Sequence, residues 1–113
     1  MRDYQFYIQD ILVAMNSIER FIAGMDRRAF EADDKTSSAV IRKLEVIGEA
    51  AKNIPDEVKT ANPQVPWSEM AGMRDRLIHA YFGIDYGLVW TAIVDRIPKI
   101  KPLILEILGG NEL

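Results

Sequence analysis

The stretch that decides the fold is residues 3–25, DYQFYIQDILVAMNSIERFIAGM, the first long segment of the 113-residue chain. Its apolar residues recur in alternating steps of four and three, which is the period of one face of an α-helix. That face consists of Tyr4, Ile8, Ile11, Met15, Ile18, Ile22 and Met25. The pattern predicts an amphipathic first helix over 3–25, ended by Gly24 and the charged residues that follow it.

Three further segments carry the same helical period, over about 40–54, 67–82 and 85–108. No segment shows the alternation of a β-strand, and the connections are short. The sequence therefore predicts an all-α fold, an up-down four-helix bundle with short accessory helical turns, in one domain over residues 1–113.

Connecting segments supply the expected breaks. Residues 29–35 are mostly polar and predict a loop with at most one helical turn, followed by N-cap candidates for the second helix. Gly48 lies inside that helix, where a glycine predicts close approach of another backbone. Pro98 and Pro102 predict a kinked or divided last helix. The N-cap candidates are Thr36, Ser37 and Ser38.

Composition limits the class of protein. With 49% hydrophobic and 27% charged residues the chain is globular, and it has no cysteine and no apolar run of membrane-spanning length, which predicts a cytoplasmic protein. A net charge of −3 argues against binding nucleic acid through a broad basic surface. A small basic cleft formed by Arg42 and Lys43 together with Arg74 and Arg76 remains compatible with it, and surplus apolar residues on the last helix predict a partner surface.

Candidate chemistry is concentrated at Arg74, His79 and Tyr81, and His79 is the only histidine. Histidine exchanges protons near neutral pH and arginine holds phosphate oxygens, so the pair points to a phosphodiester. On one helix, however, residues five apart lie ~140° apart around the axis. The two side chains therefore need an outside partner to form a site, and a surface or packing role for His79 is the plain alternative.

The longer string around these residues resembles the HepT-like branch of the HEPN superfamily. The resemblance rests on Arg74-x4-His79-x-Tyr81, on its flanks from Pro66 to Asp85, on residues 40–51 and on Ile97-Pro98. It implies a helical ribonuclease toxin of a type II toxin-antitoxin system whose motif lies at a homodimer cleft. It also implies a minimal nucleotidyltransferase as antitoxin, which would adenylylate Tyr81.

The residues themselves predict chemistry without metal or cofactor, because no cluster of metal ligands accompanies the motif. RNA carries its own nucleophile, the 2′-hydroxyl, and DNA does not, so RNA is the expected substrate. His79 is assigned as general base or acid, Arg74 as the phosphate-binding cation and Tyr81 as a positioning group. Cleavage needs two proton movements and each chain has one histidine, which again predicts a dimer.

Two alternatives stay open from the sequence. The chain could be a non-catalytic dimeric binding module in which Arg74 and Asp75 form a structural ion pair, or a nucleotide-sensing domain in which Arg74 holds a phosphate without cleaving it. Glu45 and Glu49 are interpreted as a surface ladder with Arg42, while Arg42 and Arg76 are weak candidates for binding RNA.

Overall fold

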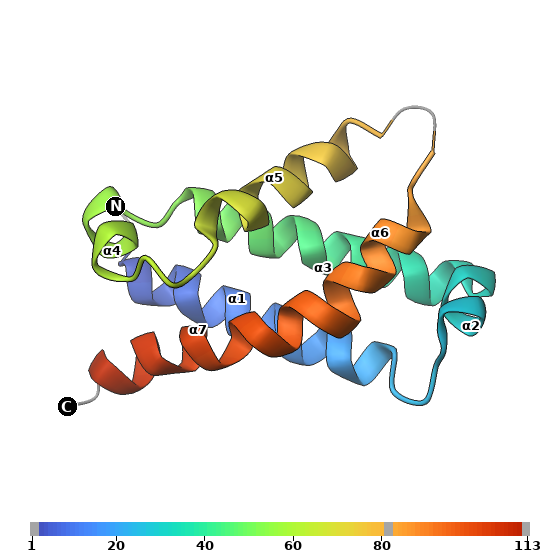
Figure 1. The fold of residues 1–113 in the computed structure, drawn as a ribbon, viewed down its shortest axis with the longest axis horizontal. Coiled ribbons are helices and arrows are strands. Elements are labelled where there is room, and N and C mark those ends of the chain that lie inside the picture. The colour runs from blue at the N-terminus through green and yellow to red at the C-terminus, as the bar shows by residue number, and fades with distance from the viewer. Residues whose placement is uncertain (1–2, 81–82, 112–113) are drawn as a thin grey trace.

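Four long helical segments run alternately in opposite directions (Figure 1). The computed structural model describes residues 3–80 and 83–111. The segments are α1 (Tyr4–Phe21), α3 (Asp34–Lys52), α5 (Trp67–Ile78) and a last rod of α6 (Tyr86–Thr91), a π-helical turn η1 (Ala92–Arg96) and α7 (Ile97–Asn111). Two short helices, α2 (Arg27–Ala32) and α4 (Asp56–Ala61), lie at opposite ends of the bundle. The predicted all-α bundle is confirmed, and none of the described helices is long and apolar enough to cross a membrane.

The core forms where the predicted apolar faces meet. Helix α3 packs against both α1 and α5, and α1 also packs against α7. The apolar face of α1 is buried at its centre, and so is the predicted face of α3. These buried residues are Ile8, Ile11, Met15 and Ile18 of α1, Val40, Leu44, Ile47 and Ala51 of α3, and Ile54 beyond it.

Gly48 marks the closest approach of α3 and α5. A Cβ atom at this position would overlap the Cβ of Arg74 and lie 2.8 Å from the carbonyl oxygen of Met70. The expectation of a nearby backbone at Gly48 is confirmed, and the contact sets the position of Arg74 against α3.

The prediction for the end of the first helix is wrong. Helix α1 ends at Phe21 rather than at Met25, and the chain turns at Gly24 with a φ of +79°. The helical turn allowed within residues 29–35 is part of α2, which begins earlier, at Arg27, and which Asp26 caps by accepting a hydrogen bond from the backbone N–H of Ala29 at 2.8 Å.

Tertiary contacts explain this short helix. Phe30 of α2 is fully buried, and its ring packs against the rings of Tyr86 and Trp90, with centroids 6.4 Å and 5.3 Å away. The N-cap of α3 is Asp33, whose carboxylate accepts from the backbone N–H of Thr36 at 3.0 Å. The second helix thus begins earlier than the caps predicted at Thr36, Ser37 or Ser38 would allow.

Helix α5 is anchored at its beginning. Trp67 is buried, and its indole N–H donates to the backbone carbonyl of Asn62 at 3.1 Å. Arg96 of η1 donates to Glu69 through two nitrogens, at 2.7 Å and 2.8 Å. The buried residues of α5 are Trp67 and Met70, both in its first half. Its second half, which carries Arg74, lies at the surface of the bundle.

Helix α5 ends at Ile78, earlier than the end predicted near Phe82 and Gly83. His79 is the C-cap residue, with φ −106° and ψ 16°. Its backbone N–H and its ring Nδ1 both contact the carbonyl oxygen of Asp75, at 3.3 Å and 2.8 Å. The histidine side chain thereby adds a second contact to a carbonyl in the last turn of the helix.

The last rod begins at the predicted cap and is interrupted as its prolines suggest. The Asp85 carboxylate accepts from the backbone N–H of Leu88 at 3.0 Å. The π-helical turn η1 occupies Ala92–Arg96, just before Pro98, while Pro102 lies inside α7. Proline lacks the N–H that would continue the α-helical hydrogen bonds, and a π-helical turn is one way in which a helix accommodates that loss.

Candidate functional site

Arg74 reaches from α5 toward the outer face of α3. Its Nε lies 3.2 Å from Oε2 of Glu49, and its Nη1 lies 3.2 Å from Oδ1 of Asp75. Lys52 contacts the same Asp75 oxygen at 2.7 Å. The guanidinium group is thus held by two carboxylates. It remains accessible to a ligand, because the Arg74 side chain is 27% exposed.

Asp75 contacts both predicted catalytic side chains. Its carboxylate binds Arg74, and its backbone carbonyl is the partner of the His79 ring. The hydrogen bond from Lys52 is the main reason that the pKa of the Asp75 carboxyl lies below its ordinary value, and the hydrogen bond from Arg74 adds to it. The carboxylate is therefore charged at neutral pH, and one residue holds a cation and an imidazole at the same end of α5.

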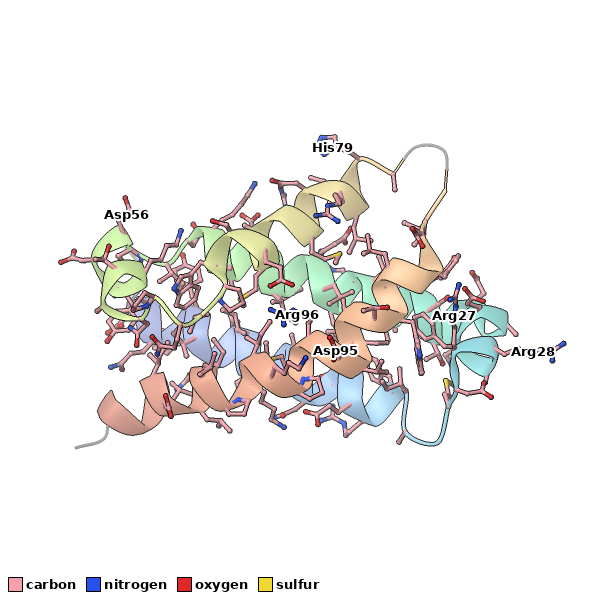
Figure 2. The ribbon with its side chains drawn as sticks, viewed as in Figure 1. Arg27, Arg28, Asp56, His79, Asp95 and Arg96 are labelled. Carbon is pink, nitrogen blue, oxygen red and sulfur yellow. The ribbon has the colours of Figure 1, made fainter. Side chains whose placement is uncertain are left out.

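The contact of the His79 ring favours one form of the neutral side chain. A backbone carbonyl only accepts hydrogen bonds, so Nδ1 carries the proton when it donates to the Asp75 carbonyl at 2.8 Å. In that tautomer Nε2 is the nitrogen that can take up a proton. His79 is exposed, and Figure 2 shows its side chain at the outer edge of the molecule. This geometry suits a general base that works on a ligand outside the bundle.

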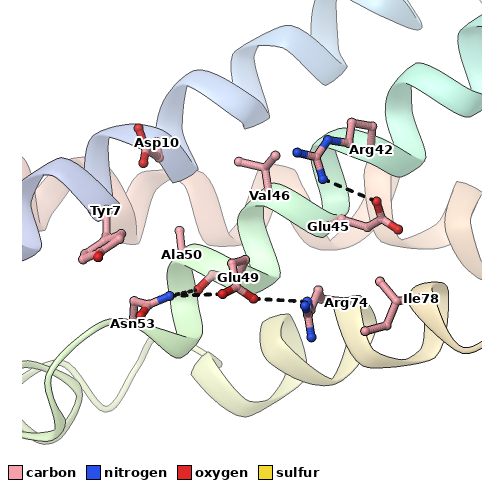
Figure 3. Close-up of a pocket in the computed structure, with 10 residues that line it drawn as sticks. All are labelled: Tyr7, Asp10, Arg42, Glu45, Val46, Glu49, Ala50, Asn53, Arg74 and Ile78. Atoms are coloured by element: carbon pink, nitrogen blue, oxygen red, sulfur yellow. Dashed lines mark hydrogen bonds and ion pairs between the residues drawn. The ribbon is translucent and has the colours of Figure 1, made fainter.

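A surface cavity of about 240 Å³ lies beside Arg74, and we call it the Arg74 cavity (Figure 3). Its lining comes from three helices, with Arg74 and Ile78 on α5, Tyr7 and Asp10 on α1, and the remaining residues on α3. These residues are Arg42, Glu45, Val46, Glu49 and Ala50 of α3 and its C-cap residue, Asn53. Three carboxylates accompany two guanidinium groups, so the cavity has mixed charge rather than the basic character that the sequence allowed.

The other predicted site residues are distributed differently. Arg42 lines the Arg74 cavity, whereas Arg76 lines a separate hollow between α5 and α6. The structure thus brings Arg42, but not Arg76, to the same cavity as Arg74. Tyr81 lies outside the described residues, so its predicted roles stay predictions.

Sequence reasoning missed the role of Glu49. Glu45 does pair with Arg42 along α3, at 3.7 Å, as a surface ladder predicts. Glu49 instead crosses to Arg74 on another helix, and the side-chain amide of Asn53 donates to its other oxygen at 3.4 Å. The spacing of Gly48 beside Glu49 was the available signal, because close approach of a second helix at a glycine places the adjacent side chain at the helix interface.

Groups of three or more histidine, cysteine, aspartate or glutamate side chains suited to a metal ion do not occur among residues 3–80 and 83–111. In the same part of the chain, every buried polar side-chain atom has a hydrogen-bond partner. The polar groups of the candidate site lie at the surface and in the Arg74 cavity.

Comparison of the sequence with known proteins identifies the family of the chain. The family model described as Ribonuclease HepT-like matches residues 11–107, which include Arg74, His79 and the lining of the Arg74 cavity on α3 and α5. The chain belongs to the HepT-like ribonuclease family. The resemblance seen in the sequence is thereby confirmed.

Individual relatives of the HepT-like chain cover nearly its whole length. It is 48% identical over 100 residues to a protein of Thermococcus cleftensis named "Probable ribonuclease HepT", covering 88% of this chain and 91% of the relative. It is 44% identical over 115 residues to a "Putative RNase" of Methanocaldococcus jannaschii, covering 98% and 95%. A protein of Caldanaerobacter subterraneus with the same kind of name is 40% identical over 102 residues, covering 90% and 91%. No solved structure matches the chain significantly.

Proposed function

We propose that this HepT-like protein is a metal-independent endoribonuclease toxin, in which Arg74 and His79 act on RNA in a groove between two copies of the chain. Membership of a ribonuclease family supports RNA cleavage as the reaction. The observation that carries the assignment of residues is the double contact of Asp75, which holds the Arg74 guanidinium by its side chain and the His79 ring by its carbonyl.

The reaction follows from these two groups. Nε2 of His79 removes the proton of a ribose 2′-hydroxyl, and the 2′-oxygen attacks the adjacent phosphorus. The bond from phosphorus to the 5′-oxygen breaks, a second imidazolium protonates that oxygen, and a 2′,3′-cyclic phosphate remains. Arg74 stabilises the negative charge that develops on the phosphoryl oxygens. Because the nucleophile belongs to the RNA, these residues need no metal ion, and DNA is not a substrate.

A second copy of the chain supplies the second imidazole. The surface next to the Arg74 cavity carries two large exposed apolar side chains on α1, Phe6 at 52% and Val13 at 60% exposure. They lie about one turn to either side of Asp10, which lines the cavity. Two copies related by a two-fold axis at this α1 face would cover the apolar side chains and bring two Arg74 cavities to one groove.

The last rod offers the competing interface that the sequence suggested. Leu88, Val94 and Leu105 are exposed there, while Ile93, Ile97, Ile100, Ile104 and Ile107 are buried in the bundle. If the dimer forms through the α1 face, Val13→Glu should convert the dimer to a monomer in sedimentation velocity and reduce cleavage. Leu105→Glu, on the last rod, should leave the dimer and the cleavage rate unchanged. A monomeric wild-type chain with full activity would contradict the dimer mechanism.

The decisive test of the activity uses purified protein and a single-stranded RNA in EDTA. We expect cleavage that leaves 2′,3′-cyclic phosphate ends, that is lost when the substrate is 2′-deoxy throughout, and that falls by about 10²–10⁴-fold in His79→Ala. Thermal unfolding should show that the variant remains folded, since His79 is exposed. Full cleavage by the variant would remove His79 from the mechanism.

The same assay separates the alternatives. Thermal stabilisation by AMP or GMP without RNA cleavage would favour a nucleotide-sensing domain that uses Arg74 as a phosphate ligand. The absence of both RNA cleavage and nucleotide binding would favour a non-catalytic dimeric module, in which the pair between Arg74 and Asp75 at 3.2 Å is structural.

We propose further that a minimal nucleotidyltransferase antitoxin silences the enzyme by transferring AMP to the hydroxyl of Tyr81. The added phosphodiester carries negative charge, which repels RNA from a site that relies on Arg74. Intact mass after incubation with the cognate transferase and ATP should show added AMP, and Tyr81→Phe should stay unmodified. Unmodified wild-type protein in that experiment would exclude this mode of control.

A further inference from the structure

The proposed reaction uses only one residue of the Arg74 cavity, the arginine that binds the phosphate. Part of the cavity lining is apolar, with Val46 and Ala50 following each other along α3, and the phenol ring of Tyr7 lines it from α1 (Figure 3). Charged and amide side chains make up most of the rest. A hollow with both apolar and polar lining, beside the arginine proposed to bind the phosphate, has the character of a site for a planar heterocycle.

The charges of the cavity argue against a second phosphate in it. Asp10, Glu45 and Glu49 all line the cavity, and their carboxylates repel an anion. Glu49 is engaged by Arg74 at 3.2 Å. Glu45 is held loosely, since its contact with Arg42 is 3.7 Å long and the Arg42 side chain is 72% exposed. A ligand that donates hydrogen bonds can therefore bind the Glu45 carboxylate, because only the weak ion pair with Arg42 is lost.

We propose that the Arg74 cavity binds the base of a nucleotide next to the scissile phosphate and selects bases with an exocyclic amino group. The inference rests on the proposed function, because it places the scissile phosphate at Arg74. Single-stranded RNA is commonly recognised in this way, with a splayed base stacked on an aromatic side chain and hydrogen-bonded along its edges.

The selection follows from the chemistry of the carboxylate. An ionised carboxylate only accepts hydrogen bonds, and Glu45 and Asp10 can therefore bind only donor groups on the base edge. Adenine, cytosine and guanine each present an amino group to such an acceptor. Uracil presents two carbonyl oxygens, which repel the carboxylate, and a single N–H. Uridine is accordingly the disfavoured nucleotide in this subsite.

The test uses short RNAs that can be cleaved at one linkage only, because every other ribose carries a 2′-O-methyl group. Two sets of four substrates place A, C, G or U on the 5′ side or on the 3′ side of that linkage. On one side, we expect kcat/KM of the wild-type protein to be about tenfold lower for uridine than for the best base, the size expected when a base-specific hydrogen bond is lost. On the other side, the four bases should differ little.

Glu45→Gln probes the carboxylate directly, because glutamine has the same shape but both donates and accepts. We expect the uridine penalty to shrink to about twofold in this variant. Glu31→Gln is the matched control, since Glu31 also pairs with an arginine of its own helix, Arg27 at 3.3 Å, but lies on α2 away from the cavity. The control should keep the wild-type preference. Asp10→Asn is a second probe from the opposite wall.

The outcomes distinguish this inference from the proposed function. Cleavage by the wild-type protein without a penalty for uridine, or an unchanged penalty in both Glu45→Gln and Asp10→Asn, would overturn the base subsite and leave the nuclease intact. A binding assay with fully 2′-O-methylated oligonucleotides measures the base preference when no cleavage is possible. If these oligonucleotides bind with a preference against uridine but the cleavable RNAs are not cut, the base subsite is supported and the nuclease is excluded. If they bind without any base preference, the subsite is excluded.

Discussion

The two halves of α5 each carry an arginine–carboxylate contact to another helix, and the two contacts border cavities of different kinds. The cavity at Arg74 has a volume of about 240 Å³ and five charged side chains, whereas the cavity at Arg96 has a volume of about 40 Å³ and a mostly apolar lining. In the first half, Glu69 binds Arg96 of η1 beside the buried Trp67. In the second half, Arg74 binds Glu49 of α3 at the edge of the Arg74 cavity. Both places hold an ion pair between two helices, so an ion pair does not by itself identify a functional site.

Surroundings make the difference. The contact between Glu69 and Arg96 closes the bundle where α5 is anchored, with two short hydrogen bonds between one guanidinium and one carboxylate. Arg74 instead divides its contacts between two carboxylates, and one of these is shared with Lys52. A cation held by longer contacts to several groups can exchange one of them for a phosphate oxygen, whereas a cation that donates two short hydrogen bonds to one carboxylate cannot do so without loss.

The largest effect should come from removing each arginine in turn. Arg74→Ala should lower RNA cleavage by about 10²–10³-fold, because it removes the cation that stabilises the transition state. Arg96→Ala should leave cleavage within about threefold and lower the free energy of unfolding only slightly, as for other partly exposed pairs. Cleavage rates and urea unfolding of both variants check this contrast. Full activity of Arg74→Ala would make the two pairs equivalent and structural.

The sequence predicted the bundle well because the periodic apolar faces of α1 and α3 coincide with the buried residues. It failed where distant contacts override local signals. Polar residues around Phe30 suggested a loop with one helical turn, whereas α2 begins two residues earlier, because the Phe30 ring packs against Trp90, which is distant in the sequence, and that packing stabilises the helix. Caps were misplaced for the same reason, since Asp33 follows directly on this helix.

For the candidate site, the sequence identified Arg74 and His79 by their chemistry and by resemblance, and it recognised that helical geometry separates them. It raised the pair between Arg74 and Asp75 but did not predict the contact of Arg74 with Glu49 or that of Lys52 with Asp75, because Glu49 and Lys52 belong to another helix and their contacts depend on the register between α3 and α5. Gly48 fixes that register. A glycine in a predicted helix indicates a close neighbour but does not say which helix that neighbour is.

Substitution of that glycine gives the second contrast. Gly48→Ala should destabilise the protein by roughly 1–3 kcal/mol, because the new Cβ meets the carbonyl oxygen of Met70 and the side chain of Arg74. Gly72→Ala is the matched control on α5, where a Cβ has no neighbour within 4 Å, and it should stabilise the protein by about 0.5–1 kcal/mol. Urea unfolding measures both. Equal effects of the two substitutions would show that α3 and α5 are less closely packed.

The smallest effect concerns the pH dependence of the anchored half of α5. The hydrogen bond from Arg96 is the main reason that the pKa of Glu69 lies below its ordinary value of 4.5. A carboxyl whose pKa is lower in the folded state stabilises the fold above its unfolded pKa, and the contribution disappears as the pH falls through the folded pKa. Glu69→Gln should therefore cost more stability at about pH 7 than at about pH 3.

The difference should be below about 1 kcal/mol, since the Glu69 side chain is 43% exposed and solvent weakens its attraction to Arg96. Urea unfolding at the two pH values measures it, with Glu106→Gln, an exposed glutamate of α7, as the control. RNA cleavage by Glu69→Gln at neutral pH should match the wild type, because the anchored half of α5 holds the helix without contacting the Arg74 cavity. A variant that loses cleavage while keeping its stability would show that the two halves of α5 share one function.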